Sequence, residues 1–593
     1  MTEQTRTDAG EARIRPAARI WRARLRSRRR GGDPGRVTAA PDAGDLRPGE
    51  PAGIVSAWPA AASRRATVAG AVAGLCLGLL ALGPGLLPGY LLSYDMVFVP
   101  SPPFNAAVVG TSGALPRAVP SDAVAAALAR LLPADAVQKA VLLAIFVLAC
   151  AGVARLLARE RLPAQLVAGV CYAWNPFVAE RLILGQWATL LGFAGLPWVV
   201  AVLAAPARGL AGRARLVAAL VPAAIGGFAA MLISGLTAVP VAALPAGETR
   251  AGLRGRLTRV GLVLAVLVVL SLPWLIPALT RHVATSTAGV GLFAARADTP
   301  FGTLGSLLML GGLWNAQTTP VGYGGVASVP WFVLAVAALA GFVLLGRRRW
   351  PGLLVAAAAG LVIAMLGALG PGQALLRGLI DWWPGFAVLR DGQQFIAPLA
   401  LAEALGLGLV TARLLAAGRT RQQRETFVAT AVALVVVPVL ILPGLAWGGA
   451  GRLRPVSYPA DWAQARQVIN ADPRPGKALL LPWSAYRRYG WNHGEAVLDP
   501  WPRLLDRDVI WNDGVQVGAV QLPPEDPAAV ALNGAIRSSR PLTSLLRSAA
   551  VRYVIVDAGF GPGPAGSQPF RSRLAGCRIV MSGPGLLVYQ VPG

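Results

Sequence analysis

Residues 250–279 read RAGLRGRLTRVGLVLAVLVVLSLPWLIPAL, which is a basic segment followed by a long apolar run. The last twenty of these residues, 260–279, include no charged side chain. An α-helix needs about 20 apolar residues to cross the hydrocarbon core of a bilayer. The stretch therefore predicts a transmembrane helix, about residues 258–279, that begins beside a basic loop.

The same pattern recurs along most of the chain and predicts about eleven spans. The chain is 55% hydrophobic and only 14% charged, and a soluble protein carries closer to a quarter charged residues. Residues 301–313 are also apolar but too short to cross, so they predict a re-entrant or interfacial segment. The other expected spans are 66–90, 137–157, 163–180, 187–205, 215–232, 235–247, 328–346, 351–369, 394–416 and 426–446.

Arginine occupies every second loop between these spans, beginning with the N-terminus, where residues 1–65 hold fourteen arginines. Cytoplasmic loops of membrane proteins carry an excess of Arg and Lys. The pattern predicts a multi-pass protein of the cell membrane with a cytoplasmic N-terminus and residues from 447 onward outside the cytoplasm. The formal net charge of +27 then reflects topology, and we expect no nucleic-acid partner.

Composition divides the chain into three expected parts. Residues 1–65 predict a disordered basic cytoplasmic tail, and residues 66–446 predict the multi-pass transmembrane domain. Residues 447–593 change to Asp, Asn, Trp and Pro clusters with short β-like runs at 478–481, 551–556, 578–581 and 586–591. Helical material separates these runs, so we expect a small extracytoplasmic α/β domain. The predicted fold class is an all-α polytopic membrane protein with this C-terminal addition.

Few residues could hold a metal ion or form a disulfide. The chain has four cysteines, of which only Cys577 falls in the expected C-terminal domain, and two histidines. No disulfide framework or His/Cys zinc site is expected. The sequence contains no Walker A, GxSxG or HExxH motif. We predict no cofactor and no metal ligand, with a divalent cation left possible.

Two acidic residues near the expected outer surface are the candidates for catalysis. Asp95 follows the first span directly and could act as a general base on an acceptor hydroxyl; alternatively it is a hydrated carboxylate at a helix end. In residues 172–181, YAWNPFVAER, the Asn175-Pro176 pair predicts a break in the third span. Glu180 could then support Asp95 or bind an acceptor.

Four cations at the same surface are the candidates for binding a donor phosphate, because arginine makes bidentate contacts with phosphate oxygens. They are Arg181, Arg281, His282 and Arg390. Each has a structural alternative. Arg181 could pair with Glu180, Arg281 with His282 could snorkel at a helix end, and Arg390 could pair with an aspartate in its own loop.

The expected C-terminal domain contains a segment rich in aromatic and hydrogen-bonding side chains, residues 481–493. Tryptophan and tyrosine offer flat faces with polar groups at their edges, which suits them to a sugar ring. Trp483, Tyr486, Trp491 and His493 are the candidate acceptor or sugar contacts. The alternative is an aromatic seam that docks this domain onto the membrane domain.

These features resemble a known superfamily. The aspartate after the first span, the long loop that follows it, the span count and the C-terminal domain resemble the GT-C membrane glycosyltransferases. Residues 175–181 with 185–187, and residues 389–391, look like the actinobacterial arabinofuranosyltransferases and mannosyltransferases of the cell envelope. The likeness covers about residues 66–450 in architecture, and its specific matches are short.

The resemblance implies transfer of a sugar from a polyprenyl-phosphate donor to an envelope glycan or glycolipid acceptor at the extracytoplasmic face, with Asp95 as the catalytic base. Family members often pair two acidic residues in this loop, whereas Asp95 is followed by Met96. Either Glu180 supplies the second carboxylate or activity has been lost. The alternative functions are a transporter or flippase for a lipid-linked glycan and a non-catalytic envelope scaffold.

Overall fold

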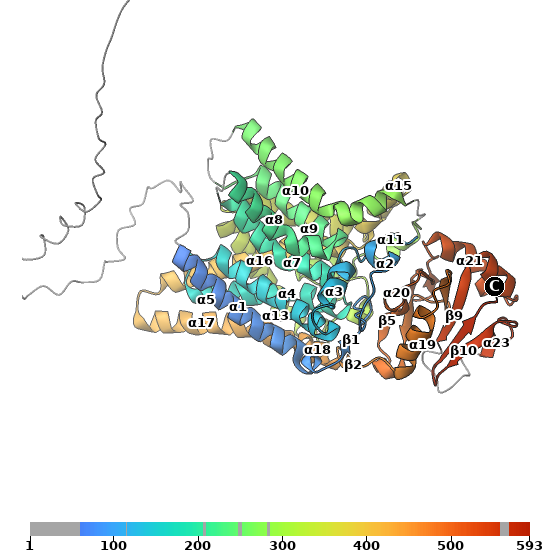
Figure 1. Cartoon of the computed structure of the whole chain (residues 1–593). Helices are drawn as coiled ribbons and strands as arrows, with labels where there is room; N and C mark the ends of the chain where they lie inside the picture. Colours follow the sequence, from blue (N-terminus) through green and yellow to red (C-terminus); the bar gives the residue numbers. More distant parts are fainter. Residues whose placement is uncertain are drawn as a thin grey trace, which may run out of the picture. The chain divides into compact units, whose positions relative to one another are not determined.

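The computed structural model describes residues 60–113, 115–205, 209–246, 252–281, 285–557 and 568–592. Most of the tail predicted at 1–65 lies outside these residues, and so does His282. The described chain is mainly helical and ends in a region of short strands and helices (Figure 1). It is a multi-pass membrane protein with a small α/β region at its C-terminus, as the predicted fold class states.

Eight helical segments within the described residues are long and apolar enough to cross a membrane. A ninth crossing is possible if the bent pair α14 (Pro351–Leu366) and α15 (Gly370–Trp382), with an angle of 92°, counts as one span. The count of eleven is therefore not confirmed. The eight segments are built on α1 (Ala60–Leu82), α4 (Ala134–Leu156), α7 (Trp187–Ala204), α8 (Gly209–Gly226), α10 (Leu253–Thr280), α13 (Ser328–Gly341), α16 (Ala397–Ala417) and α17 (Arg421–Ile441).

The difference in count arises mainly where an expected span is short or broken. The expected span 163–180 is divided into α5 (Leu162–Ala173) and α6 (Pro176–Ile183), and neither is long enough to cross alone. The expected span 235–247 corresponds to the shorter apolar helix α9 (Phe228–Ala243). The break at Asn175-Pro176 is present as predicted, because proline cannot continue a helix from the preceding turn.

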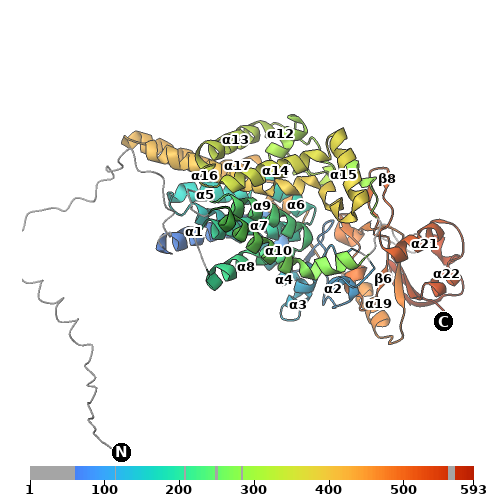
Figure 2. The same ribbon diagram turned by 90° about the horizontal axis from the view of Figure 1, so that it is seen from above.

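Small residues let the central helices pack closely, as is usual in membrane proteins. A methyl group on Gly74 of α1 would lie 2.4 Å from the backbone oxygen of Phe146 in α4. One on Gly406 would lie 1.9 Å from the backbone oxygen of Ala338, where α16 packs against α13 (Figure 2). These helices would have to move apart if either glycine became larger.

Two of the loops that the arginine pattern placed together do meet at one end of the helices, beside the last turn of α16. Arg349, which follows α13, forms an ion pair of 3.4 Å with Glu160, between α4 and α5. Arg161 of that same loop donates a 3.2 Å hydrogen bond to the carbonyl of Leu415 near the end of α16. The membrane face on which this end lies remains a prediction.

The C-terminal region is built on a five-stranded mixed sheet of order β10-β11-β9-β3-β6. Its central strands β3 (Lys477–Leu481) and β9 (Val551–Asp557) are parallel, while β9, β11 (Leu586–Gln590) and β10 (Arg578–Ser582) are antiparallel to one another in turn. β6 (Val509–Ile510) adds to the other edge. All four predicted β-runs are strands.

Each face of this sheet is covered by helix. Ala478 and Leu480 of β3 face the cluster that includes Trp462 of α19 (Ala460–Asn470). Leu479 and Leu481 belong to the opposite cluster, with α21 (Pro527–Arg537) and α22 (Thr543–Ser548). Successive side chains of a strand point to opposite faces, so the continuous apolar run in β3 is what a strand buried on both sides requires.

Candidate functional site

Asp95 sits in a tight turn that follows the first span. Ser93 and Met96 exchange two backbone hydrogen bonds of 3.3 and 2.8 Å, which close the turn. Tyr94 takes a positive φ of 43° inside it, and this conformation is strained for a residue with a side chain. The Asp95 backbone N–H donates to the carbonyl of Leu184 at 3.0 Å. The chain thus fixes the position of the carboxylate from both sides.

The turn rests on a glycine that no other residue could replace easily. Gly185 has φ +82°, and a methyl group there would lie 2.2 Å from the backbone nitrogen of Met96 and 2.3 Å from the carbonyl oxygen of Ser93. The hydroxyl of Ser93 also donates to the Ile183 carbonyl at 2.6 Å. The end of α6 and the Asp95 turn therefore form one closely packed unit.

The Asp95 carboxylate is half-buried and accepts two side-chain hydrogen bonds. Tyr486 donates to Oδ1 at 2.5 Å, and Gln186 donates to Oδ2 at 3.3 Å. Burial raises the pKa of Asp95 above its usual range, and the two hydrogen bonds oppose that rise because they stabilise the ionised form. A carboxylate in these surroundings is a stronger base than one in water.

Tyr486 reaches Asp95 because the C-terminal region docks directly onto the turn. The hairpin of β4 (Tyr486–Arg488) and β5 (Ala496–Leu498) carries this tyrosine. Tyr94 N–H donates to the Ala496 carbonyl at 2.7 Å, and Leu498 N–H donates to the Tyr94 carbonyl at 2.8 Å. Of the four predicted sugar contacts, Tyr486 is the one placed at Asp95.

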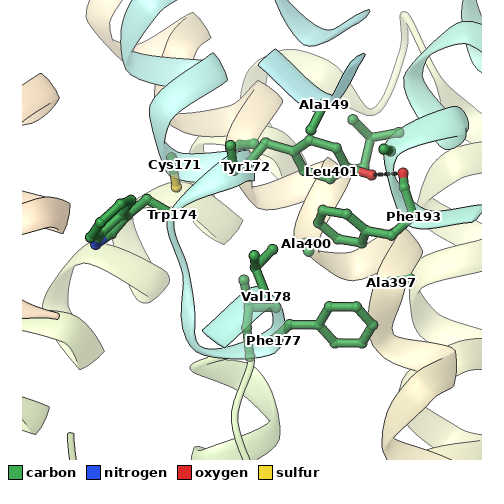
Figure 3. Packing of buried hydrophobic residues seen from close by; sticks show 14 of the residues in the cluster. Ala149, Cys171, Tyr172, Trp174, Phe177, Val178, Phe193, Ala397, Ala400 and Leu401 are labelled. Carbon is green, nitrogen blue, oxygen red and sulfur yellow. Dashed lines mark hydrogen bonds between the residues drawn. The ribbon is translucent and has the colours of Figure 1, made fainter. Parts of the chain in front are cut away.

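Helix α6 is held in place by a capped break and an aromatic stack. The Asn175 side chain accepts from Val178 N–H at 3.0 Å and donates to the carbonyl of Tyr172 at 2.8 Å, so it satisfies both helix ends. Phe193 of α7 stacks on Tyr172 with ring centroids 4.2 Å apart and on Phe177 with centroids 5.0 Å apart (Figure 3). The charged residues of α6 thereby occupy fixed positions.

Arg181 of α6 is fully buried and all five of its N–H donors are occupied. It makes bidentate hydrogen bonds of 2.6 and 2.8 Å to Asp391, and the remaining donors contact Gln393 and Gln186. No donor is left for a substrate phosphate, so this geometry does not support the phosphate role predicted for Arg181. Its ion pair is with Asp391 and not with Glu180.

Arg181 instead extends the hydrogen-bond network of Asp95 inward. Gln186 accepts from Arg181 through its carbonyl oxygen and donates to Asp95 through its amide nitrogen. A single glutamine therefore connects the buried guanidinium to the half-buried carboxylate. Gln186 is held in the one amide orientation that presents a donor to Asp95.

Glu180 lies deeper than Asp95 and is fully buried. Its Oε2 accepts from the Leu313 N–H and from the Gln393 side chain, both at 3.3 Å. Its Oε1 has no hydrogen-bond partner among the residues that the structure describes. Asp95 is not among the partners of Glu180.

Arg390 lies near two further charged residues that join the membrane region to the C-terminal region. Glu525 pairs with Arg117 of the loop after the first span and lies 3.9 Å from Arg390. The charge of Arg117 favours the ionised form of Asp95, and burial lowers the pKa of Arg390. Two guanidinium groups thus surround one carboxylate close to the candidate base.

The other predicted site residues lie apart from Asp95 or outside the described residues. Arg281 follows α10 and donates to the Thr111 carbonyl at 2.6 Å, and its buried Nε has no partner among the described residues; His282 is not described. Trp483 donates to Asn533 at 2.9 Å. Trp491 stacks on Tyr489 with centroids 4.9 Å apart, and His493 is exposed.

Sequence reasoning missed several members of the site. Gln186 lies in the segment 185–187 named in the sequence analysis, but its position in the sequence did not indicate a contact with Asp95. Arg117, Glu525 and Asp391 come from separate parts of the chain, and only the fold brings them together. Among the described residues, no group of three or more His, Cys, Asp or Glu side chains is placed to hold a metal ion.

The order of membrane spans followed by a C-terminal α/β region is shared with a solved glycosyltransferase structure, so the predicted architecture is confirmed at the level of the fold. In particular, the chain is similar to the arabinofuranosyltransferase AftD from Mycobacteria, with a TM-score of 0.57 and 18% identity over 89% of this chain and 40% of that chain. This chain therefore spans about two-fifths of the length of that structure.

Two other solved structures are more distant. The oligosaccharyltransferase of Archaeoglobus fulgidus has a TM-score of 0.37 and 15% identity over 83% of this chain and 68% of that chain. ArnT from Cupriavidus metallidurans bound to undecaprenyl phosphate has a TM-score of 0.35 and 13% identity over 90% and 99%. No protein-family model and no curated protein matches the chain.

Proposed function

We propose that this chain is an integral membrane glycosyltransferase that takes a sugar from a polyprenyl-phosphate donor and adds it to an envelope glycan or glycolipid. The reaction takes place at the extracytoplasmic face. The observation that carries the proposal is the half-buried Asp95 carboxylate, held by Tyr486 and Gln186 with cations nearby. The shared fold with AftD supports the class of reaction.

Asp95 is the general base of this reaction. The acceptor hydroxyl loses its proton to Asp95 while its oxygen bonds to the anomeric carbon of the donor sugar. The bond from that carbon to the phosphate oxygen breaks, and polyprenyl phosphate leaves with the electron pair. The base passes its proton to water afterwards. A single displacement of this kind inverts the configuration at the anomeric carbon.

The leaving phosphate gains negative charge as the bond breaks, so positive groups near it lower the barrier. Arg390 and Arg117 are our candidates for this role, supported by their shared contact with Glu525 and by the effect of the Arg117 charge on Asp95. Arg281 remains a candidate through its unpartnered Nε. The acceptor would lie on the side of the carboxylate that Tyr486 and Gln186 leave open.

The test is transfer by the purified full-length protein in nanodiscs, with radiolabelled polyprenyl-phosphate arabinofuranose as the first donor. Asp95→Asn retains the shape of the side chain but removes the base, so transfer should fall by about 100-fold or more. Asp381→Asn, an exposed position on α15, is the matched control and should leave the rate unchanged. A wild-type rate in Asp95→Asn would exclude this residue as the base.

One observation favours translocation of a lipid-linked glycan as a second candidate function. Glu403, within the span built on α16, is buried, and in the part of the chain that the structure describes its Oε1 has no hydrogen-bond partner. Ionisable groups inside a membrane are costly and tend to be functional. The test is movement of a fluorescent lipid-linked glycan across vesicle membranes. Movement that Glu403→Gln abolishes, with no covalent product formed, would establish this alternative in place of transfer.

A further inference from the structure

A pocket of about 530 Å³ opens between the end of the first span and helix α19. Its volume falls within the range of about 300–1,000 Å³ that is usual for small-molecule sites. Asp95 is not part of it, so it is distinct from the carboxylate site. Its lining consists of Tyr90, Pro100, Ser457, Tyr458, Pro459, Ala460, Trp462, Ala463, Arg466, Gln467, Asn470 and Leu504.

Aromatic rings make up much of this lining. Tyr90 and Tyr458 are half-buried and meet edge to face, with centroids 5.5 Å apart. Tyr458 in turn lies 5.6 Å from the ring of Trp462, which stacks on Trp501 behind it at 4.4 Å. The aromatic wall is therefore supported from behind by the core of the C-terminal region.

Several hydrogen-bonding groups of the lining have no protein partner among the described residues. They are the hydroxyls of Tyr90 and Ser457 and the side-chain amide of Gln467. Asn470 uses its Oδ1 to accept from the Asp506 N–H at 3.3 Å, which leaves its amide N–H groups unused. Donors and acceptors that have no protein partner, beside flat apolar rings, can bind a ligand that carries many hydroxyl groups.

The charge of the lining comes from one side chain. Arg466 is its single ionised residue, and its terminal nitrogens donate to the carbonyls of Pro100 at 3.0 Å and Ser101 at 2.8 Å. These two bonds fix the guanidinium against the wall of the pocket, while its charge and its other three N–H donors stay available to a ligand. A hydrocarbon chain cannot form hydrogen bonds with these polar groups, so its binding would leave them unsatisfied and would be weaker for that reason.

We propose that this pocket binds carbohydrate, namely sugar units of the acceptor glycan beyond the one that reacts. The inference rests on the proposed function for its biological role. Tyr90 precedes Asp95 by five residues, so their Cα atoms are at most about 17 Å apart. A glycan held in the pocket is within reach of the base, and binding at this distance orients the acceptor hydroxyl.

The experiment measures binding of a neutral arabino-oligosaccharide to the full-length protein in nanodiscs by saturation-transfer NMR. Gln467→Ala removes the side-chain amide of Gln467, one of the groups without a protein partner, and should weaken binding roughly threefold to tenfold. Ala463→Phe places a ring in the pocket from an exposed position on α19 and should weaken it at least about tenfold. Gln464→Ala, on the same helix but outside the lining, is the matched control and should bind as wild type.

Binding and transfer separate the two proposals. Asp95→Asn should abolish transfer yet bind the oligosaccharide as wild type does, because that residue lies outside the pocket. No saturable binding by wild type, or wild-type binding by both Gln467→Ala and Ala463→Phe, would overturn this inference while Asp95-dependent transfer could still stand. Displacement of the sugar by phospholipid or by polyprenyl phosphate at this pocket would equally overturn it and identify a lipid site.

Discussion

The Tyr486 hydroxyl donates a 2.5 Å hydrogen bond to Oδ1 of Asp95, although 391 positions separate the two residues in sequence. This bond ties the C-terminal region to the turn after the first span. It also favours the ionised form of Asp95, so it lowers a pKa that burial raises. The protonation state of Asp95, the proposed base, therefore depends on Tyr486, which belongs to the C-terminal region.

Replacing Tyr486 with Phe should move the acid limb of kcat/KM to higher pH. Without the hydroxyl, burial acts with less opposition and the pKa of Asp95 rises further. The base works only when deprotonated, so activity will be lost at a higher pH than in wild type, while the plateau at high pH changes less than about tenfold. The pH profile of transfer by the purified protein measures this shift.

Tyr553→Phe is the matched control for that measurement. The Tyr553 hydroxyl also donates to a carboxylate, that of Asp472 at 2.7 Å, but it does so within the C-terminal sheet. Its loss should leave the acid limb in place. An acid limb that stays fixed in Tyr486→Phe, or moves to lower pH, would contradict the role assigned to this hydrogen bond.

Replacing Arg181 with Lys should destabilise the protein although the charge is retained. Lysine has three donors on one nitrogen and cannot reproduce the bidentate contact with Asp391 together with those to Gln393 and Gln186. Buried acceptors would be left unpaired, at a cost of about 2 kcal/mol or more in the free energy of unfolding. Thermal unfolding in detergent measures this loss.

A second Arg-to-Lys substitution controls for the chemistry of the exchange. Arg421 is 93% exposed and pairs with Glu425 one turn along α17, so Arg421→Lys should change the free energy of unfolding by less than about 0.5 kcal/mol. Equal effects of the two substitutions would mean that the Arg181 network contributes nothing to stability.

The fold could be predicted from the sequence wherever a pattern is local. Apolar runs of sufficient length indicated the spans, and the four β-runs became β3, β9, β10 and β11. Continuous apolar stretches suit strands buried on both faces, as β3, β9 and β11 are, whereas β10 is an exposed edge strand. The span count could not be predicted as well, since a helix break such as Asn175-Pro176 turns one apolar run into two short helices. Orientation in the membrane stays a prediction.

The candidate site was harder to predict from the sequence than the fold. Asp95 could be selected because it follows a span, which fixes its depth. The partners of Arg181 could not be predicted, because Asp391 lies 210 residues away and only the packing of α6 decides where the guanidinium points. Likewise, residue type alone cannot tell an arginine with free donors from one whose donors are all occupied.

Replacing Gly185 with Ala should displace the Asp95 turn. The new methyl group would lie 2.2 Å from the Met96 nitrogen, and φ +82° is unfavourable for alanine. Transfer should fall at least about tenfold, since a shift of about 1 Å in a reacting group is costly. Gly378→Ala, on α15 with open space around it, should leave transfer unchanged; equal activity of the two variants would show that the turn is not held as described.

Replacing Glu525 with Gln should strengthen binding of the donor. The Glu525 carboxylate neutralises Arg117 and lies 3.9 Å from Arg390, so it occupies the place of an anion between the two proposed phosphate contacts. A neutral amide leaves that positive charge for the substrate, and KM for the polyprenyl-phosphate sugar should fall by roughly threefold to tenfold. The backbone bond from Glu525 to Asp513, 2.8 Å long, is retained. Kinetics at varied donor concentration, with exposed Glu425→Gln as the control, decide the matter: a KM that rises or stays constant would place the donor phosphate away from Arg117 and Arg390.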